Sequence, residues 1–415
     1  MTKKPSYRFV GYTESWEEKK FQELSTKKGK KNTNGESYPV YSVSNQSGLI
    51  PQSEQFEGSR LDNLDKKSYK IVEPNEFAYN PARINVGSIA FNNLNHRVIV
   101  SSLYVIFILD KKVDNSFAIQ FIKSDKFIKE VKRNTEGSVR EYLFYENFSN
   151  IRLPYPPSLP EQTAIGSFFQ DIDQLISLQQ RKLEVLKEQK KTYLKLLFPA
   201  KGQTKPALRF AGFEDDWKEV KLGEVGETYT GLSGKTKEDF GHGEGKFITY
   251  VNVFNNPLTD LYGLDSIEID DKQRRVQYGD VLFTTSSETP EDVGLSSVWM
   301  GTEDNVYLNS FCFGYRLQKG IFDLYYLAFV LRSFSVRREF MLLAQGISRF
   351  NISKTKVMDM FIHIPSLPEQ EAIGSFFQDL DKAIAKQEEK LTSSKKANKP
   401  YSEKCLYKIQ RPSKA

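Results

Sequence analysis

The sequence predicts a mixed α/β protein in which two α/β globules are separated by two long antiparallel helices that form a coiled coil. Three observations support this fold class. The chain has 415 residues, enough for two or three domains. A segment in its middle recurs near its end, and a repeat fixes the architecture before any element is assigned. The stretches around the two copies are rich in β-branched and aromatic residues, which are typical of strands.

The internal repeat has two landmarks in each half of the chain. Residues 158–184 and 366–392 match at 18 of 27 positions, at a shift of 208 residues. Upstream of each copy, residues 5–9 and 206–210 share the pattern Pro-x-x-Arg-Phe at a shift of 201. The order of elements is therefore the same twice, whereas the sequences between the landmarks differ.

Each copy of the longer motif predicts the start of a helix. Pro160 and Pro368 suit a first helical turn, and the glutamate after each suits the positive end of the helix dipole. From Ile165 to Leu197, apolar residues recur at alternating steps of four and three with two polar interruptions, which is the heptad seam of a coiled coil. Pro199 ends this first helix.

The second helix is predicted to be shorter than the first. Its apolar seam continues only to Leu391, and Pro400 would interrupt a longer helix. We therefore expect a distal helix over residues 366–398 and an irregular tail over 399–415. Two matching apolar stripes in one chain can cover each other, so we expect an intramolecular, antiparallel two-helix coil.

The remaining sequence predicts the globules. Residues 99–109 and 246–254 have the composition of strands, and residues 323–343 have a helical pattern. Two related globules joined by antiparallel helices would be related by an approximate two-fold axis. The predicted organisation is a first globule (1–157), a central helix (158–199), a linker with the second globule (200–365), the distal helix (366–398) and the tail (399–415).

Composition gives little material for catalysis. Two cysteines and three scattered histidines are a poor supply for a disulfide framework, a zinc site or a nucleophile with its base. Gly241 to Lys246 lacks the spacing of a phosphate-binding loop, and Asn80 to Arg83 is only half of an adenine methyltransferase loop. The sequence shows neither a secretion signal nor a run of about 18 apolar residues. We expect a non-catalytic, cytoplasmic protein without a metal or cofactor of its own.

The motif Leu-Pro-Glu-Gln-x-Ala-Ile-Gly-Ser-Phe-Phe-Gln-Asp-x-Asp, at residues 159–173 in the first copy, strongly resembles the conserved regions of type I restriction-modification specificity subunits. The segments that begin at Pro5 and Pro206 resemble the openings of a first and a second target recognition domain. The resemblance implies a DNA-binding subunit that serves host defence and is itself not catalytic. Its implied partners are double-stranded DNA, two modification (methyltransferase) subunits and restriction/translocase subunits. S-adenosylmethionine would bind to the modification subunits, and ATP and Mg to the restriction subunits.

This interpretation predicts a bipartite, asymmetric DNA target, because the two globules differ in sequence. The net charge of +6 is mild, so any nucleic-acid surface must be local. A non-catalytic coiled-coil adaptor is the alternative, although it does not explain two large dissimilar globules. A stand-alone modification or restriction enzyme would need a further catalytic domain, for which the duplicated chain has no room.

Affinity should come from cations on phosphates, and discrimination from polar and aromatic side chains at base edges. Arg140 and Arg349 hold similar places, each after a glycine and before the last strand of its globule. The candidates in the first globule are Lys28, Lys30, Tyr41, Ser44, Arg83, Asn92, Asn93, Arg97 and Arg140. The candidates in the second globule are Lys235, Lys237, Tyr250, Asn252, Asn255, Arg274, Arg275, Thr284, Thr285, Ser286 and Arg349. The helix residues expected to face outward and bind partner subunits are Gln170, Asp173, Gln180 and Lys187.

Overall fold

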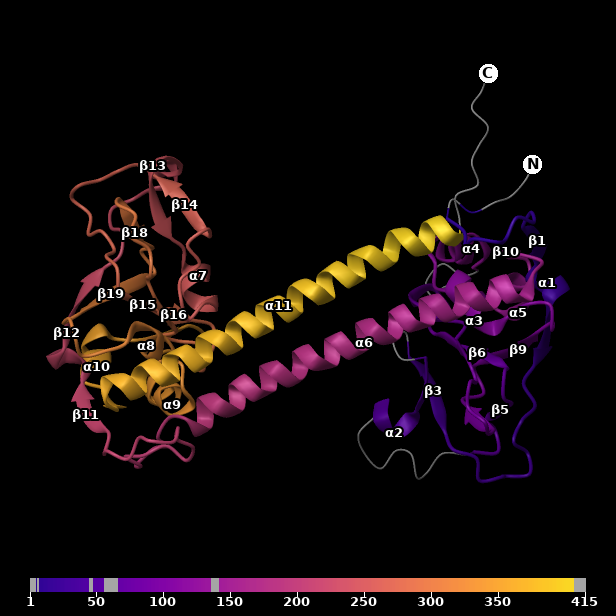
Figure 1. Ribbon diagram of the computed structural model, residues 1–415, viewed down its shortest axis with the longest axis horizontal. Coiled ribbons are helices and arrows are strands. Elements are labelled where there is room, and N and C mark those ends of the chain that lie inside the picture. Colours follow the sequence, from indigo (N-terminus) through magenta and orange to yellow (C-terminus); the bar gives the residue numbers. More distant parts are fainter. Residues whose placement is uncertain (1–4, 6, 45–47, 56–65, 136–141, 407–415) are drawn as a thin grey trace, which may run out of the picture. The chain divides into compact units, whose positions relative to one another are not determined.

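The computed structural model describes residues 5, 7–44, 48–55, 66–135 and 142–406 (Figure 1). The chain divides into two compact units. Unit 1 comprises residues 1–180 and 390–415, and unit 2 comprises residues 181–389. Both units combine strands and helices, which confirms the predicted mixed α/β class.

The long helices α6 (Leu159–Leu196) and α11 (Leu367–Leu406) each contribute to both units. The elements of unit 1 outside the long helices are β1 (Glu17–Lys20), α1 (Phe21–Leu24), β2 (Ser25–Lys28), β3 (Tyr41–Ser44), β4 (Gly48–Pro51), α2 (Gln52–Gln55), β5 (Lys70–Val72), β6 (Phe77–Tyr79), η2 (Ile84–Val86), β7 (Ile89–Phe91), β8 (Val98–Val100), β9 (Val105–Leu109), α3 (Asn115–Ile122), α4 (Asp125–Asn134), α5 (Tyr145–Phe148) and β10 (Arg152–Tyr155). Those of unit 2 are β11 (Lys218–Lys221), η3 (Leu222–Glu224), β12 (Gly226–Thr230), η4 (Lys237–Asp239), β13 (Phe240–Ile248), α7 (Tyr250–Asn255), β14 (Leu264–Ile267), β15 (Val281–Thr284), β16 (Ser286–Ser287), β17 (Ser296–Val298), β18 (Val306–Leu308), β19 (Cys312–Leu317), α8 (Leu324–Val330), α9 (Phe334–Leu343), β20 (Phe350–Asn351), α10 (Lys354–Met358) and β21 (Phe361–Ile364).

The repeat extends through the central sheet of each unit. The strand order is β2-β9-β6-β7 in unit 1 and β12-β19-β15-β17 in unit 2, so each strand has a counterpart. A stacked aromatic pair joins the two central counterpart strands in each sheet: Phe77 with Phe107 between β6 and β9, and Phe283 with Phe313 between β15 and β19. These four rings are fully buried. The two globules therefore share one frame although their sequences differ.

One predicted strand is half wrong. Residues 99–109 do form strands β8 and β9, but of residues 246–254 only the first part belongs to strand β13. Residues Tyr250–Asn255 form helix α7, because the Thr249 hydroxyl caps the helix by accepting a hydrogen bond from the Asn252 backbone N–H, at 3.2 Å. A local cap thus outweighs the strand propensity of the valines and aromatic residues in this segment.

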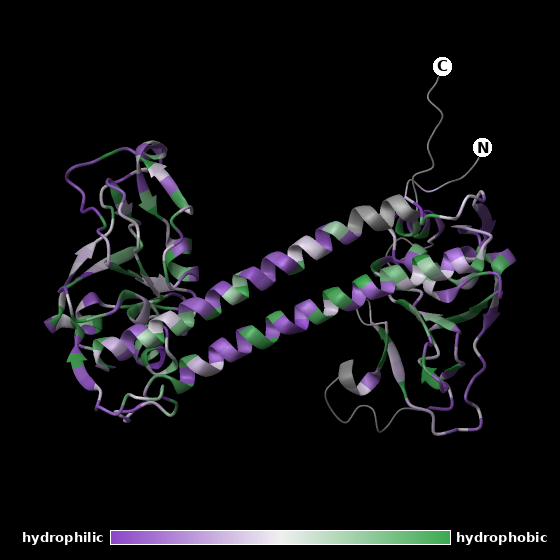
Figure 2. Cartoon of the chain, viewed as in Figure 1, coloured by the Kyte–Doolittle hydropathy of each residue, from purple (hydrophilic) through white to green (hydrophobic). Residues whose placement is uncertain are grey.

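The two long helices are α6 (Leu159–Leu196) and α11 (Leu367–Leu406), which alternate polar and apolar residues along their length (Figure 2). Within unit 2 they run antiparallel: Lys187 pairs with Glu388 and Lys190 with Asp381, each at 2.6 Å. Within unit 1 the pairing is also antiparallel, since Lys395 donates to Gln180 and Asn398 to Asp173. The predicted intramolecular helix pair is thus present in each unit.

The predicted end of the distal helix at residue 398 is wrong. Helix α11 has 40 residues and is not shorter than α6, which has 38. Lysine and alanine favour the helix after the apolar seam ends. Leu391 is buried, and Lys395 and Asn398 bond to α6, so contacts within unit 1 continue beyond the seam. Residues 407–415 of the predicted tail lie outside the described part of the chain.

Cys312 lies on β19 in the core of unit 2. Burial raises the pKa of its thiol to about 12, so the reactive thiolate is scarce at pH 8. We expect iodoacetamide at pH 8 to leave Cys312 unmodified in the folded protein and to alkylate it after denaturation. Peptide mass spectrometry measures this difference, and equal modification in both states would contradict the burial.

Candidate nucleic-acid interface

The repeated motif fixes the start of each long helix on its globule. Glu161 is fully buried and accepts two hydrogen bonds of 2.6 Å from the guanidinium of Arg8. In unit 2, Glu369 is 1% exposed and accepts two bonds of 2.7 Å from Arg209. Both arginines belong to the shorter repeated pattern, so the two landmarks of the repeat are partners in space.

The glutamine after each glutamate links the long helix to a second helix of the globule. Gln162 accepts a hydrogen bond from the Asp114 backbone N–H at 2.8 Å, and Gln370 accepts one from Asp323 at 2.9 Å. Asp114 and Asp323 are themselves the N-caps of α3 and α8. Each glutamine thus holds the capped end of the helix that packs beside it.

A glycine in the motif allows this helix contact to be close. A Cβ added at Gly166 would lie 2.7 Å from the backbone nitrogen of Phe117. A Cβ at Gly374 would lie 2.6 Å from the Asp323 carboxylate and 2.7 Å from the Tyr326 nitrogen. The motif that carries the family resemblance therefore acts here as a structural junction, a role that its sequence did not reveal.

The exposed predicted DNA-binding residues of unit 1 include Lys28, Lys30, Arg83 and Asn93. Arg83 and Tyr41 line one cavity of about 180 Å³ between β3 and the loop after β6. Ser44 and Asn93 line a second cavity, of about 430 Å³, together with Gln170 and Asp173 of α6. The structure thus brings predicted DNA-binding residues together in two places on unit 1.

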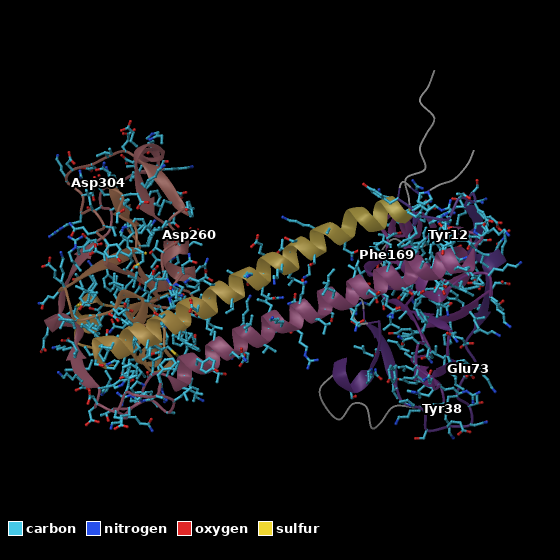
Figure 3. All side chains as sticks on the ribbon, in the orientation of Figure 1. Tyr12, Tyr38, Glu73, Phe169, Asp260 and Asp304 are labelled. Carbon is cyan, nitrogen blue, oxygen red and sulfur yellow. The ribbon has the colours of Figure 1, made fainter. Side chains whose placement is uncertain are left out.

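Two other candidates of unit 1 do not fit a reading surface. Asn92 is 1% exposed and uses its amide to hold the turn from residue 92 to 96, so its prediction as a base-contacting residue is wrong. Arg97 is exposed but pairs with Glu73 at 2.7 Å and donates to Tyr38, and both partners are labelled in Figure 3. Arg140 lies outside the described residues.

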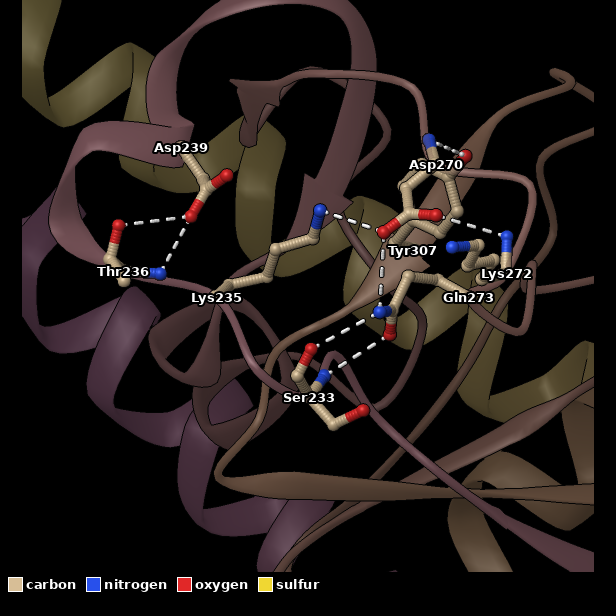
Figure 4. A network of polar contacts seen from close by, with 8 residues as sticks. All are labelled: Ser233, Lys235, Thr236, Asp239, Asp270, Lys272, Gln273 and Tyr307. Carbon is tan, nitrogen blue, oxygen red and sulfur yellow. Dashed lines mark hydrogen bonds and ion pairs between the residues drawn. The ribbon is translucent and has the colours of Figure 1, made fainter.

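Lys235 of unit 2 is part of a polar network and is not a free cation (Figure 4). Its ammonium group lies 2.8 Å from Asp270, and its side chain is 14% exposed. The hydrogen bond to Lys235 lowers the pKa of Asp270. The Gln273 side-chain amide donates one hydrogen bond to the same carboxylate and another to the Ser233 carbonyl. Lys235 therefore serves the fold, whereas Lys237 nearby is exposed.

Burial removes further candidates of unit 2 from a DNA-facing surface. Asn252 is 6% exposed and hydrogen-bonds the backbone of Asp260 and Gly263. Thr284 is fully buried, and Ser286 is 8% exposed. The prediction that these three side chains contact bases is wrong. Thr284 and Ser286 lie on buried paired strands, and Asn252 holds a turn. The half-buried Thr285 donates to the Phe311 carbonyl.

The remaining candidates of unit 2 include one assembled group. The Tyr250 hydroxyl donates to the Ser286 carbonyl at 2.7 Å, and β16 pairs with β20, which directly follows Arg349. Arg349 is exposed. Asn255 and Arg274 are also exposed, while Arg275 pairs with Asp271. Tyr250 and Arg349 thus lie in one region of unit 2, connected through the buried strand β16.

Three of the four predicted partner-facing residues contact the second long helix of this chain. Asp173 accepts from Asn398 and pairs with Lys123, Gln180 accepts from Lys395, and Lys187 pairs with Glu388. Lys187 is nevertheless 54% exposed, as predicted for an outward-facing residue, whereas Asp173 and Gln180 are half-buried. The heptad pattern did not indicate the exposed apolar residues of α6, among them Leu175 and Leu178 at 52% and 58% exposure.

No three of the described histidine, cysteine, aspartate and glutamate residues are grouped so that they could hold a metal ion. Within the same part of the chain, every helix is too short or too polar to cross a bilayer.

Comparison with known proteins identifies the family. Residues 13–188 and 214–393 each match the model described as the type I restriction modification DNA specificity domain. The MjaVIII specificity subunit of Methanocaldococcus jannaschii is 26% identical over 295 residues, which cover 64% of each chain. The putative MjaX specificity subunit of the same organism is 26% identical over 205 residues, 44% of this chain and 47% of its own. The matched region thus spans less than two thirds of either relative.

Two solved structures share the fold. The S subunit of a type I restriction-modification system from M. genitalium superposes with a TM-score of 0.58 at 11% identity, covering 98% of this chain and 100% of its own. A chain from a study of complex assembly and conformational transition of the type I R-M system has a TM-score of 0.53 at 16% identity, covering 94% and 97%. The duplicated motif, the shared frame of the two units and the match of the specificity model to both halves agree: this chain belongs to the type I restriction-modification DNA specificity family.

Proposed function

We propose that this chain is the DNA-binding subunit of a cytoplasmic type I restriction-modification complex and that each unit reads one half of a bipartite, asymmetric target. The supporting observation is that equivalent strands lead into different loops. After β6, unit 1 presents Asn80 to Arg83, with Arg83 exposed beside Tyr41. After the equivalent β15, unit 2 has Thr285 and the buried strand β16. One frame thus carries two chemically different surfaces, which suits two different half-sites.

Exposed cations support nucleic-acid binding by both units. Among the described residues, several of the predicted lysines and arginines form no ion pair, so their charge is available to phosphates. These residues are Lys28, Lys30 and Arg83 in unit 1 and Lys237, Arg274 and Arg349 in unit 2.

We further propose that two modification subunits dock on the long helices, and that these subunits and the restriction subunits supply the chemistry. On α6, exposed Phe168, Leu175 and Leu178 follow the spacing of a coiled-coil seam, which suits an apolar helix of a partner. The matching positions of α11 are Phe376, Ala383 and Lys386, so the second docking surface would be more polar.

The proposal is tested by co-expressing this chain with a modification subunit in a host and mapping methylated adenines by sequencing. We expect a bipartite motif that requires both proteins, and no methylation from either protein alone. Methylation that is independent of this chain would refute the proposal. A coiled-coil adaptor would join subunits without selecting any sequence, so pull-down of DNA fragments by the complex separates that alternative.

Arg349→Ala is expected to weaken recognition of one half-site. Loss of a base or phosphate contact costs about 1–3 kcal/mol, which is roughly 5- to 150-fold in affinity. Assembly with the modification subunit should not change, because Arg349 is not on a long helix. Methyl transfer to the target and size-exclusion chromatography measure the two effects. The control is Arg275→Ala, which removes an arginine that already pairs with Asp271. An unchanged DNA affinity would remove Arg349 from the reading surface.

A further inference from the structure

Residues 345–351 of unit 2 form a hairpin with a firmly held base. Gln345 and Asn351 exchange two backbone hydrogen bonds, of 2.9 and 2.8 Å. On its other edge the returning strand β20 pairs with β16, with Ser286 opposite Asn351 and Ser287 opposite Phe350. Ile352 is buried in the core immediately after the hairpin, and its backbone N–H donates to the Thr285 carbonyl at 3.0 Å.

The turn of this hairpin is fixed by its own backbone. Gly346 has a φ of +136°, a conformation that L side chains rarely adopt. A Cβ at this position would collide with the carbonyl oxygen of Arg349, on the opposite side of the turn. The hairpin is therefore closed tightly on itself, and its tip has a defined conformation relative to the sheet of unit 2.

The tip presents an apolar side chain to solvent. Ile347 is 97% exposed, and the next residues, Ser348 and Arg349, are exposed as well. Burial of Ile347 therefore contributes almost nothing to the stability of the fold. Single exposed apolar residues are common, but this one is at the end of a narrow, anchored ribbon, two positions from a cation without an ion pair among the described residues. A two-stranded ribbon of this kind fits the DNA major groove.

We propose that the tip of this hairpin enters the major groove and that the Ile347 side chain contacts the C5-methyl group of a thymine, with Arg349 on an adjacent base edge or phosphate. The inference rests on the proposed function and assigns one specificity-determining residue of unit 2. Among base-pair edges in the major groove, the thymine methyl is the apolar group. An exposed isoleucine gains stabilisation there and would lose it opposite a cytosine, which lacks the methyl group.

The experiment removes that methyl group alone. After the target has been found by adenine mapping, each of its thymines is replaced in turn by uracil, which pairs identically. Affinities are measured by fluorescence anisotropy for the complex of this chain with the modification subunits. One uracil replacement is expected to weaken the wild-type complex about fourfold, the value of one buried methyl-sized group. Ile347→Ala should bind the natural duplex about fourfold more weakly and be insensitive to that replacement.

Tyr262→Ala is the matched control, because Tyr262 is 98% exposed in unit 2 but lies outside the hairpin. It should keep the wild-type sensitivity to uracil, and both variants should keep the thermal midpoint of the wild type. Equal responses of wild type and Ile347→Ala to every replacement, or a target without a sensitive thymine, would overturn the inference. If the wild-type complex prefers no sequence at all, the proposed function itself fails, which is a separate result.

Discussion

Replacing Arg209 with leucine is expected to lower the free energy of unfolding by about 3–5 kcal/mol, the usual cost of leaving one member of a buried ion pair alone. Glu369 is 1% exposed and accepts both of its short side-chain bonds from the Arg209 guanidinium. The same hydrogen bonds raise the pKa of Arg209, so the arginine is charged at neutral pH. Without it, the carboxylate is buried without a counter-ion. Urea denaturation followed by circular dichroism measures the loss.

Two further variants make this prediction specific. Arg209→Leu combined with Glu369→Leu should recover much of the lost stability, because no charge then remains buried. Lys205→Leu breaks an exposed pair with Asp216, in which the two side chains are 52% and 79% exposed, and should change stability by less than about 1 kcal/mol. If Lys205→Leu and Arg209→Leu unfold at the same urea concentration, the junction is not held by its buried charges.

Gly374→Val is expected to destabilise unit 2 by about 3 kcal/mol, because an overpacked helix contact typically costs 1–3 kcal/mol and a lost N-cap about 1 kcal/mol more. The added Cβ would approach both the capping Asp323 carboxylate and the backbone nitrogen of Tyr326 to less than 3 Å. Helix α8 must therefore shift away from α11, and its cap is broken. Thermal and urea unfolding measure the effect.

The control for this variant is the next residue of the same helix. Ser375 is exposed, so Ser375→Val changes only helix propensity, worth a few tenths of a kcal/mol. Equal stability of the Gly374→Val and Ser375→Val proteins would show that α8 and α11 are not in close contact at this point.

The order of globules and long helices could be predicted because the same motifs occur twice in the sequence. The matched segments located both long helices, and their heptad seams predicted an antiparallel pair. The sequence pattern did not predict some individual elements, because contacts of single side chains outweighed the local propensity. Tyr250 to Phe254 has strand composition, yet the side chain of Thr249 caps a helix there. The end of α11 depends on bonds to α6 that a one-dimensional pattern does not contain.

The candidate DNA-binding residues were harder to predict, because residue type does not reveal burial. Asn92 and Asn252 have the amides expected of base-reading residues, but both amides are consumed by backbone groups of turns. Lys235 is not available to bind phosphate, because it pairs with Asp270, which is distant in sequence. The sequence does not single out Ile347 for the opposite reason, since an apolar residue is normally expected in a core. Only its 97% exposure distinguishes it.

The junction between helix and globule also bears on how such proteins diversify. Its contacts come from a small set of buried residues that is the same in both units, while the loops that differ lie elsewhere on each sheet. A globule that carries the matching arginine and capped helix is thus expected to be interchangeable with another on the same helix end. Under the proposed function, new combinations of half-sites would then require only recombination at the repeated segment, without coordinated change elsewhere in the chain.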